Sequence, residues 1–410
     1  MEGAEIFTLT FDVYQTLGIA IFALVFGGFL KQRIPVLDRL CIPSPVIGGL
    51  IFAIIATILY FCGLVNFKFD SNLKEFAMVM FFTSIGFQAD FKALKRGGKS
   101  FIILLLLVVV LILAENFTAV GVSKLVGIDP LLGLGTGSIS MVGCPGTAAA
   151  FGPLIEAKGI EGAATVSIAA AAFGLAISSI IGGPIGKFLI NRKKLAKPRQ
   201  GNKKTGGETK DKFSMAINEE MQNRRNVKYY VMAFFELGIA MAIGTLVSML
   251  LNLTGLTFPI YIGSLIAAVI FRNLGDISGL FRTSNQEIED IGDLMLSVFL
   301  SITMISLNLT VLANLALPII ILLLAQTVLI VAFCMFVVFP AMGKDYDSAV
   351  IMSGTIGFGM GSTPNAMANM NVLVEAFKPS KKAFLVVPII GCMFSDFINS
   401  VVITLFINFL

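Results

Sequence analysis

Residues 353–371 read SGTIGFGMGSTPNAMANMN, and they place an unusual amount of polarity inside an otherwise apolar sequence. Four glycines and Pro364 interrupt the hydrophobic run, while threonine, serine and asparagine supply uncharged hydrogen-bonding groups. Broken backbone at membrane depth is tolerated only where it is buried in protein or lines a watery cavity, because unpaired peptide groups are costly in lipid. The stretch is therefore predicted to form an enclosed site, although close helix packing would also use such small residues.

A second stretch of the same kind lies upstream at residues 133–153, GLGTGSISMVGCPGTAAAFGP. It again mixes glycine, proline, serine and threonine within an apolar segment. The two regions align without a gap, since GIDPLLGLGTGSISMVGCPGT (127–147) pairs with GKDYDSAVIMSGTIGFGMGST (343–363). This repeat predicts that the chain consists of two related halves.

The composition indicates a membrane protein. Hydrophobic residues make up 56% of the 410 residues and charged residues 13%, against about 25% charged in soluble domains. The chain has no histidine and no hydrolase, zinc-protease or Walker motif, which argues against an enzyme. Apolar runs long enough to cross a bilayer are predicted at ten places: 11–30, 44–62, 75–91, 100–126, 160–190, 228–251, 258–272, 291–310, 315–340 and 383–407.

A basic stretch at residues 191–227 divides the chain and is predicted to be a cytoplasmic linker. The first domain, 1–190, is then a five-helix repeat with a re-entrant hairpin at 131–156. The second domain, 228–410, is an inverted five-helix repeat with a re-entrant hairpin at 346–376. An odd number of crossings turns the second copy upside down, as in secondary transporters. The predicted fold class is an all-α integral membrane protein with ten transmembrane helices.

The positions of lysine and arginine predict the orientation of the chain. Positive residues in short loops stay in the cytoplasm. With both termini outside, all but four of the 30 basic residues lie on the inner side, and the exceptions are Lys68, Lys74, Lys124 and Lys158. If either glycine-rich segment crossed fully, the basic loop that follows it would be external. Both segments are therefore predicted to enter the membrane and turn back, from opposite faces.

The hairpins are predicted to bind a carboxylate and sodium. Helix N-termini and free amides at glycine turns attract carboxylates, whereas hydroxyls, side-chain amides and carbonyls suit sodium. Neither glycine-rich stretch contains lysine or arginine, so dipoles and hydroxyls would hold the anion. The predicted substrate-binding residues are Ser138, Ser140, Gly143, Gly146, Thr147, Thr355, Gly359, Gly361, Ser362, Thr363 and Asn365.

Acidic residues deep in the predicted spans extend this site. Asp396 lies about 20 Å along a helix from Ala383, and Asn399 is one turn further on. A lone acid at this depth costs about 2.5 to 3.5 kcal/mol, so Asp396 is predicted to bind sodium or an ammonium group, although it could instead fix helix packing. The predicted sodium ligands are Asp396, Asn399, Asn369 and Thr363. Glu115 and Glu236 are further acids within spans, and a functional role for either stays open.

Four motifs carry a family resemblance: IPSPVIGGL (42–50), GSISMVGCPGTAAAF (137–151), GTIGFGMGSTPNAMANM (354–370) and FLVVPIIGCMFSDFINSVV (384–402). They resemble the sodium/glutamate symporter family of bacteria over nearly the whole chain outside the linker. The resemblance implies a sodium-coupled glutamate importer of the bacterial inner membrane, and a homodimer whose protomers each pair a scaffold with a mobile transport core. Where the family commonly has GGHGTG, this chain has GCPGT at 143–147, with Cys144 and Pro145 in place of Gly-His.

Other functions remain open at this point. A sodium- or proton-coupled transporter of another small carboxylate would use the same hairpins, and Asp396 or Glu115 could carry its proton. A channel could be built from the same broken helices. The expected partners are glutamate or a similar small carboxylate, sodium as the coupling ion, the lipid bilayer and a second copy of the chain, with no nucleic acid.

Overall fold

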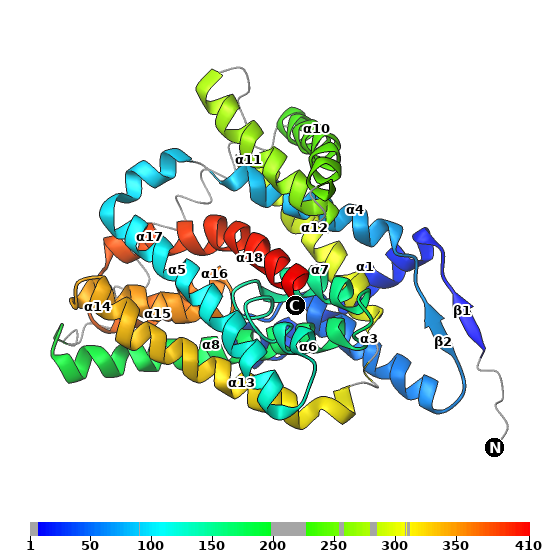
Figure 1. Cartoon of the computed structure of the whole chain (residues 1–410), viewed down its shortest axis with the longest axis horizontal. Coiled ribbons are helices and arrows are strands. Elements are labelled where there is room, and N and C mark those ends of the chain that lie inside the picture. Colours follow the sequence, from blue (N-terminus) through cyan, green and yellow to red (C-terminus); the bar gives the residue numbers. More distant parts are fainter. Residues whose placement is uncertain are drawn as a thin grey trace.

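The computed structural model is almost entirely helical (Figure 1), and it describes residues 7–89, 91–197, 227–253, 258–278, 285–307, 309 and 312–410. The helices of the first half are α1 (Val13–Arg33), α2 (Pro35–Arg39), α3 (Ser44–Phe61), α4 (Asn72–Gln88), α5 (Phe91–Val126), α6 (Pro130–Leu134), α7 (Cys144–Glu156) and α8 (Ala163–Lys193). Those of the second half are α10 (Val227–Asn252), α11 (Ile260–Ser278), α12 (Asn285–Ile305), α13 (Leu312–Phe333), η2 (Cys334–Val338), α14 (Phe339–Ala341), α15 (Tyr346–Met360), α16 (Thr363–Ala376), α17 (Lys381–Ile389), η3 (Ile390–Phe394) and α18 (Ser395–Phe409). Most of the predicted linker, 198–226, lies outside the described residues.

Each of the ten apolar ranges that the sequence predicts overlaps a helix of the structure. Within the described part of the chain, six helical segments are long and apolar enough to cross a membrane by themselves: Val13–Arg33, Ser44–Phe61, Gly98–Val126, Ala163–Lys193, Tyr229–Asn252 and Leu315–Ala341. Shorter apolar helices occur at Ile260–Gly275 and Ser395–Phe409. The structure therefore agrees with a helical integral membrane protein.

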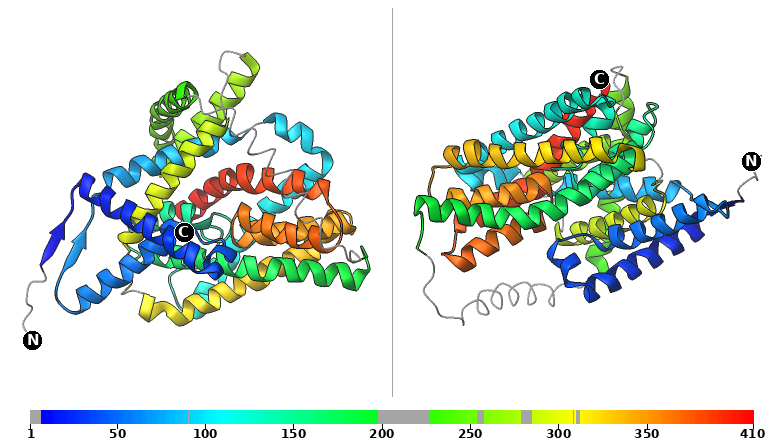
Figure 2. Two further views of the ribbon diagram at one scale, coloured as in Figure 1. Left: turned by 180° about the vertical axis from the view of Figure 1, so that it is seen from behind. Right: turned by 90° about the horizontal axis from the view of Figure 1, so that it is seen from below.

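The helices form two groups, and each group draws on both halves of the chain (Figure 2). The first group contains α1, α3 and α4 together with α10, α11 and α12. The second contains α5, α6, α7 and α8 together with α13 and α15 to α18. Contacts of α12 with α7 and of α18 with α4 join the groups. Each group thus combines helices from the first and the second half of the chain.

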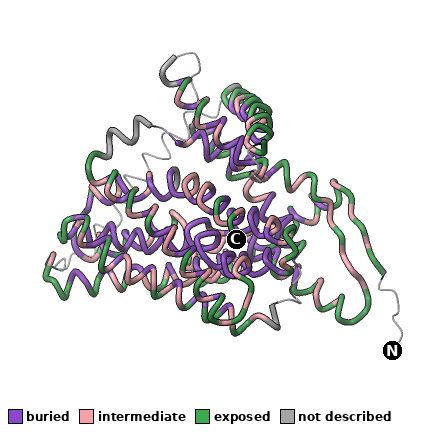
Figure 3. The backbone as a smooth tube through the Cα atoms, in the orientation of Figure 1, coloured by how far each residue is buried: buried purple, intermediate pink, exposed green. Residues whose placement is uncertain are grey.

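The second group encloses α15, which is buried at every position except Asp347. Buried backbone accordingly gathers in the middle of the molecule in Figure 3, whereas α10 and β1 are largely exposed. Small residues allow the close approach of α16. A Cβ atom at Gly357 would lie 2.5 Å from the main-chain nitrogen of Ala366. Helices that pack this closely need glycine at the contact.

Two apolar spans of the second half contain π-helical turns. The turn η2 separates α13 from α14, and η3 separates α17 from α18. Pro388 lies at the end of α17 and lacks the amide proton that a regular helix would use. Such turns are frequent at functional sites. As a result Asp396 lies in the first turn of α18, directly after a π-helical turn, instead of in the middle of one straight helix.

Two short strands interrupt the helical pattern. β1 (Thr8–Thr10) pairs in parallel with β2 (Asn66–Lys68), with Thr8 opposite Asn66 and Thr10 opposite Lys68. Aromatic rings stack beside the pair, since the ring centroids of Phe11 and Phe69 are 5.4 Å apart. The sequence pattern does not predict this pairing, because each strand has only three residues.

Candidate functional site

The two glycine-rich stretches meet inside the second helix group. In the first, α6 is followed by the non-helical residues 135–143, and α7 then begins at Cys144. In the second, α15 ends at Met360, and α16 begins at Thr363 after Gly361 and Ser362. The thiol of Cys144 donates a hydrogen bond to the carbonyl oxygen of Gly361. The two breaks in the helices are therefore in direct contact.

Both helices that begin at this contact have N-termini without a side-chain cap. Neither Gly143 at α7 nor Ser362 at α16 accepts an amide hydrogen bond through its side chain. The Ser362 hydroxyl donates instead to the side-chain oxygen of Asn365. The first amides of a helix have no intrahelical acceptor, and its N-terminus carries about half a positive charge. With no lysine or arginine in α7 or α16, the two helix ends are the positive groups that favour an anion here.

Side chains from other elements hold the non-helical part of the first stretch. The amide and the hydroxyl of Ser138 both donate to Oδ1 of Asn116 on α5, at 3.0 and 2.8 Å. Nδ2 of Asn399 on α18 donates to the Ser138 carbonyl oxygen at 2.9 Å. The Ser140 hydroxyl lies 2.6 Å from the carbonyl oxygen of Ser167 on α8. The predicted residues Ser138 and Asn399 are thus brought together, and Asn116 is a partner that the sequence did not reveal.

The second stretch is held mainly by α8. Nδ2 of Asn365 lies 2.9 Å from the Ser178 hydroxyl and 2.7 Å from the Ser179 hydroxyl. Nδ2 of Asn369 donates to the Ser178 carbonyl oxygen at 3.0 Å. These serines were not among the predicted site residues. The signal that could have identified them is the pair of serines followed by Gly182 within an apolar span, AISSIIGG (176–183).

Two predicted residues of α7 lie close to its start. Thr147 is buried, and its amide donates to the Gly143 carbonyl oxygen at 3.1 Å. Gly146 faces the first helix group, since a Cβ atom there would lie 3.3 Å from both Phe81 and Leu296. The start of α7 therefore lies at the boundary between the two helix groups.

Two predicted residues of α15 make packing contacts instead of facing the break. A Cβ atom at Gly359 would lie 3.2 Å from Leu111 on α5 and 3.6 Å from Ile330 on α13. The hydroxyl of Thr355 donates to the Ile351 carbonyl oxygen of its own helix at 2.9 Å. Both positions shape the hairpin in this structure.

The four predicted sodium ligands are distributed over two elements. Asn369 and Thr363 belong to α16, whereas Asp396 and Asn399 belong to α18. Asp396 is half-buried, and its main-chain oxygen accepts a hydrogen bond from the Ser400 hydroxyl at 2.8 Å. None of the hydrogen bonds found among the described residues joins two of the four. Asn399 is the member in contact with the first glycine-rich stretch.

Asp345 anchors α15 at the end opposite the break. Its carboxylate accepts hydrogen bonds from the amide of Ser348 at 2.8 Å and from the Ser348 hydroxyl at 2.5 Å. Burial raises the pKa of Asp345, but these hydrogen bonds and the nearby Lys382 more than offset it, and the pKa lies below its usual value. The capped end therefore contrasts with the uncapped start of α16.

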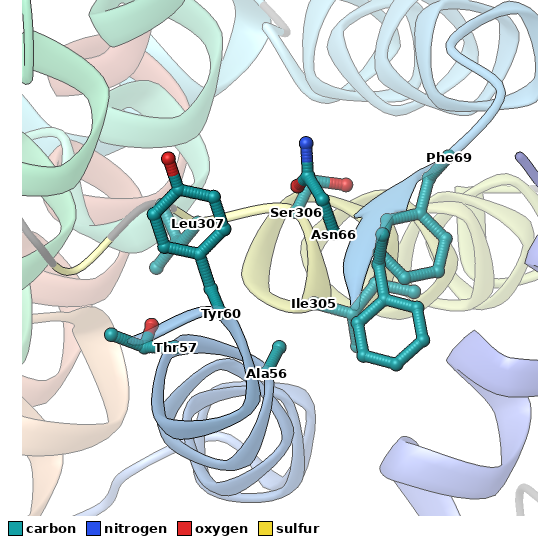
Figure 4. Close-up of a pocket in the computed structure, with 9 residues that line it drawn as sticks. Ala56, Thr57, Tyr60, Asn66, Phe69, Ile305, Ser306 and Leu307 are labelled. Atoms are coloured by element: carbon teal, nitrogen blue, oxygen red, sulfur yellow. The ribbon is translucent and has the colours of Figure 1, made fainter. Parts of the chain in front are cut away.

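Two cavities lie away from the helix breaks. The smaller, of about 120 Å³, is lined by residues of α3 and β2 and by the end of α12, with Tyr60 and Phe69 on opposite sides (Figure 4). The larger, of about 560 Å³, lies beside the end of α7 and includes Glu156 and Glu161. Ser306 lines both cavities. The larger cavity adjoins the base of the first hairpin, and neither cavity is lined by a predicted site residue.

Helix breaks that meet within a helical membrane protein, lined by dipoles and uncharged polar groups, are the pattern of secondary transporters. A profile described as sodium/glutamate symporter matches residues 9–379. The chain belongs to this family of transporters, which are not enzymes. This confirms the family that the four sequence motifs indicate.

Named relatives resemble the chain over almost its whole length. The sodium/glutamate symporter of Haemophilus influenzae is 37% identical over 392 residues, covering 95% of this chain and 96% of the relative. That of Escherichia coli K12 is 35% identical over 398 residues, covering 97% of each. Among solved structures, the sodium proton antiporter MjNhaP1 from Methanocaldococcus jannaschii aligns over 96% of each chain at 17% identity, with a TM-score of 0.45.

Proposed function

We propose that the chain imports glutamate together with sodium by alternating access, across the inner membrane of a bacterium. The observation that carries the proposal is the contact between two uncapped helix N-termini in a member of the sodium/glutamate symporter family. The named relatives are sodium/glutamate symporters that share more than nine-tenths of their length with this chain.

Glutamate matches the charges at the contact. It carries two carboxylates and one ammonium group, and each of the two helix N-termini would attract one carboxylate. The carbonyl end of α15 at Gly361 has the opposite polarity and suits a positive group. The groups proposed to line the substrate are Gly143, Gly146, Thr147, Gly361, Ser362, Thr363 and Asn365. Ser138, Ser140, Thr355 and Gly359 are proposed to shape the two hairpins around it.

Sodium is proposed to bind where α18 meets the first hairpin. Oδ1 of Asn399 is buried and has no hydrogen-bond partner in the structure, although Nδ2 of the same amide is engaged. A hard cation is a suitable partner for such an oxygen, and the nearby Asp396 would supply the negative charge. Asn369 and Thr363 are proposed to contribute from the second hairpin as it closes over the substrate.

The two halves are proposed to be inverted repeats of five crossings each, 1–190 and 228–410, joined by a cytoplasmic linker at 191–227. The hairpins at 131–156 and 346–376 would enter from opposite faces, and both termini would lie outside. Support comes from the distribution of basic residues and from the two helix groups, each of which combines helices from both halves. The first group would be the scaffold of a homodimer and the second group the mobile transport core.

Uptake of radiolabelled glutamate into proteoliposomes tests this function. Saturable uptake is expected with an inward sodium gradient and not with lithium or a proton gradient alone. An inside-negative potential is expected to accelerate it, because glutamate carries one negative charge and at least two sodium ions are proposed to accompany it. Uptake of a different carboxylate in preference to glutamate would favour a transporter of another small carboxylate. Single-channel conductance steps would favour a channel.

A further inference from the structure

Glu115 is a fully buried acid in α5 that the proposed transport site does not use. It has no solvent exposure, and neither carboxylate oxygen has a hydrogen-bond partner. Gln326 of α13 is equally buried and lies against it, since its Nε2 donates to the main-chain oxygen of Glu115 at 2.8 Å. Oε1 of Gln326 also has no partner. The contact between α5 and α13 thus holds three oxygen acceptors and no donor for them.

The orientation of the Gln326 amide is fixed by its neighbour. Reversing the amide would place Oε1 against the Glu115 carbonyl oxygen, so that two acceptors would face each other. The missing donor must therefore come from elsewhere. A protonated carboxylic acid is itself a donor, whereas an ionised carboxylate only accepts.

Among the residues that the structure describes, no salt bridge to Glu115 is found. Of the helices that pack on α5, α13 and α6 have no titratable residue, η2 carries Cys334, α18 carries Asp396, and η3 carries Cys392, whose side chain lies outside the described part. The lysines of α17 are at its first two positions, 381 and 382. An unpaired charge inside protein is strongly disfavoured, and the group neutralises instead.

We propose that Glu115 carries a proton in this packed state and donates it to the free oxygen of Gln326. One proton on Glu115 turns its carboxylate from an acceptor into a donor. The protonated group satisfies the Gln326 oxygen and no longer carries an uncompensated charge. When the proton leaves, it passes to water and a carboxylate remains. That step requires water at a contact whose two side chains are fully buried in this structure, so deprotonation is linked to separation of the packed elements.

The contact between Glu115 and Gln326 lies within one helical turn of α5 residues that touch both hairpins. Asn116, the next residue of α5, holds Ser138 of the first hairpin. Leu111, four residues before Glu115, packs against Gly359 of the second hairpin. Because Glu115 is so close to both hairpins, its protonated form would favour the arrangement in which the hairpins are packed against α5. Uptake should therefore decline when the pH rises enough to ionise Glu115.

Infrared difference spectroscopy of the purified protein in lipid tests the proton directly. The spectrum of the wild type minus that of Glu115→Gln is expected to contain the carbonyl band of a protonated carboxyl group, shifted in heavy water and unchanged by sodium. A difference spectrum with only ionised carboxylate bands would overturn the proposal. So would a protonated band that disappears when sodium is added, because sodium would then be the ligand. This arm does not depend on the proposed function.

The transport arm rests on the proposed function and uses the same variant. Wild-type uptake is expected to fall with rising pH, while Glu115→Gln, which mimics the protonated acid, is expected to lose that dependence and keep its sodium dependence. Glu236→Gln, in α10 of the other helix group, serves as the matched control and should retain the wild-type pH profile. If Glu115→Gln inserted normally and kept the wild-type pH profile of uptake, Glu115 would not be the group that titrates and the proposal would be wrong.

Discussion

The two glycine-rich stretches have similar sequences but different structures. The second consists of two regular helices, α15 of 15 residues and α16 of 14 residues, separated only by Gly361 and Ser362. The first has a short leg, α6 of 5 residues, and the non-helical residues 135–143 before α7. The second combines close packing of α15 on α16 at Gly357 with hydrogen bonds from Asn365 and Asn369 to α8. The first depends on side chains from α5 and α18 and on the Ser167 carbonyl oxygen of α8.

The aligned sequences explain this difference. Positions 133, 135 and 137 are glycine, whereas the aligned positions 349, 351 and 353 are alanine, isoleucine and serine. Glycine costs about 1 kcal/mol relative to alanine in a helix interior, so three alternating glycines weaken the helix at 133–137, whereas Gly354 and Gly357 of the second stretch lie further along the chain. An unwound segment in an apolar setting must find other hydrogen-bond partners. Asn116, Asn399 and the Ser167 carbonyl provide them.

The largest effect is expected from adding a methyl group where α15 and α16 pack closely in the second hairpin. In Gly357→Ala the new methyl group would meet the main chain of Ala366, which cannot move aside. We expect glutamate uptake to fall by about a hundredfold or more, equivalent to about 2.7 kcal/mol of barrier. The control is Gly121→Ala on α5, where a Cβ atom would meet nothing within 4 Å. Uptake by Gly357→Ala close to the wild-type rate would refute the need for close packing of α15 on α16.

Asp396→Asn tests whether the cation binds where α18 meets the first hairpin. The substitution keeps the shape and removes the charge next to Asn399, which contacts Ser138. The sodium concentration for half-maximal uptake is expected to rise at least about tenfold, corresponding to about 1.4 kcal/mol. If Asp396 holds the ammonium group instead, glutamate affinity will fall while sodium binding without substrate is retained. Unaltered dependence on both would mean that Asp396 only packs helices.

Asn116→Ala tests the dependence of the first hairpin on other elements. Two donors of Ser138 lose their shared acceptor in a fully buried setting. Each unsatisfied group costs about 1 to 3 kcal/mol, so the loss of two partners is expected to make the variant less stable by about 2 to 6 kcal/mol in thermal unfolding in detergent. Thr404→Val is the control, since its buried hydroxyl bonds only within its own helix, to Ser400. Equal stability of the two variants would contradict the comparison.

The smallest effect concerns Cys144, the first residue of α7. Its φ of 58° lies in the left-handed region that favours glycine, and a non-glycine residue there costs about 1 to 2 kcal/mol. Cys144→Ala keeps this strain and loses the contact with Gly361. Cys144→Gly loses the contact but relieves the strain, so it is expected to be the more stable variant by about 1 kcal/mol. The order of their unfolding midpoints checks this, and the reverse order would show that the strain is absent.

The sequence predicted the class of fold, the family and the contact between the two glycine-rich stretches. It predicted fewer of the individual contacts within the site. Hydrophobic runs, basic loops and the internal repeat are properties of the chain itself. Ser178 and Asn116 were missed because their roles depend on contacts between distant elements, and single polar residues in an apolar span have many explanations. Thr355 and Gly359 were assigned to the substrate because polarity within the stretch does not reveal which side faces the break.

The alkylation rate of Cys144 tests most directly whether glutamate binds between the two helix N-termini. The other four cysteines, Cys41, Cys62, Cys334 and Cys392, are replaced, so that the half-buried thiol at the contact is the reporter. Saturating glutamate with sodium is expected to slow alkylation at least about tenfold, and either alone should have little effect. A protein that retains only the exposed Cys62 should show no protection. Alkylation of Cys144 at the same rate with and without glutamate plus sodium would contradict a substrate site at this contact.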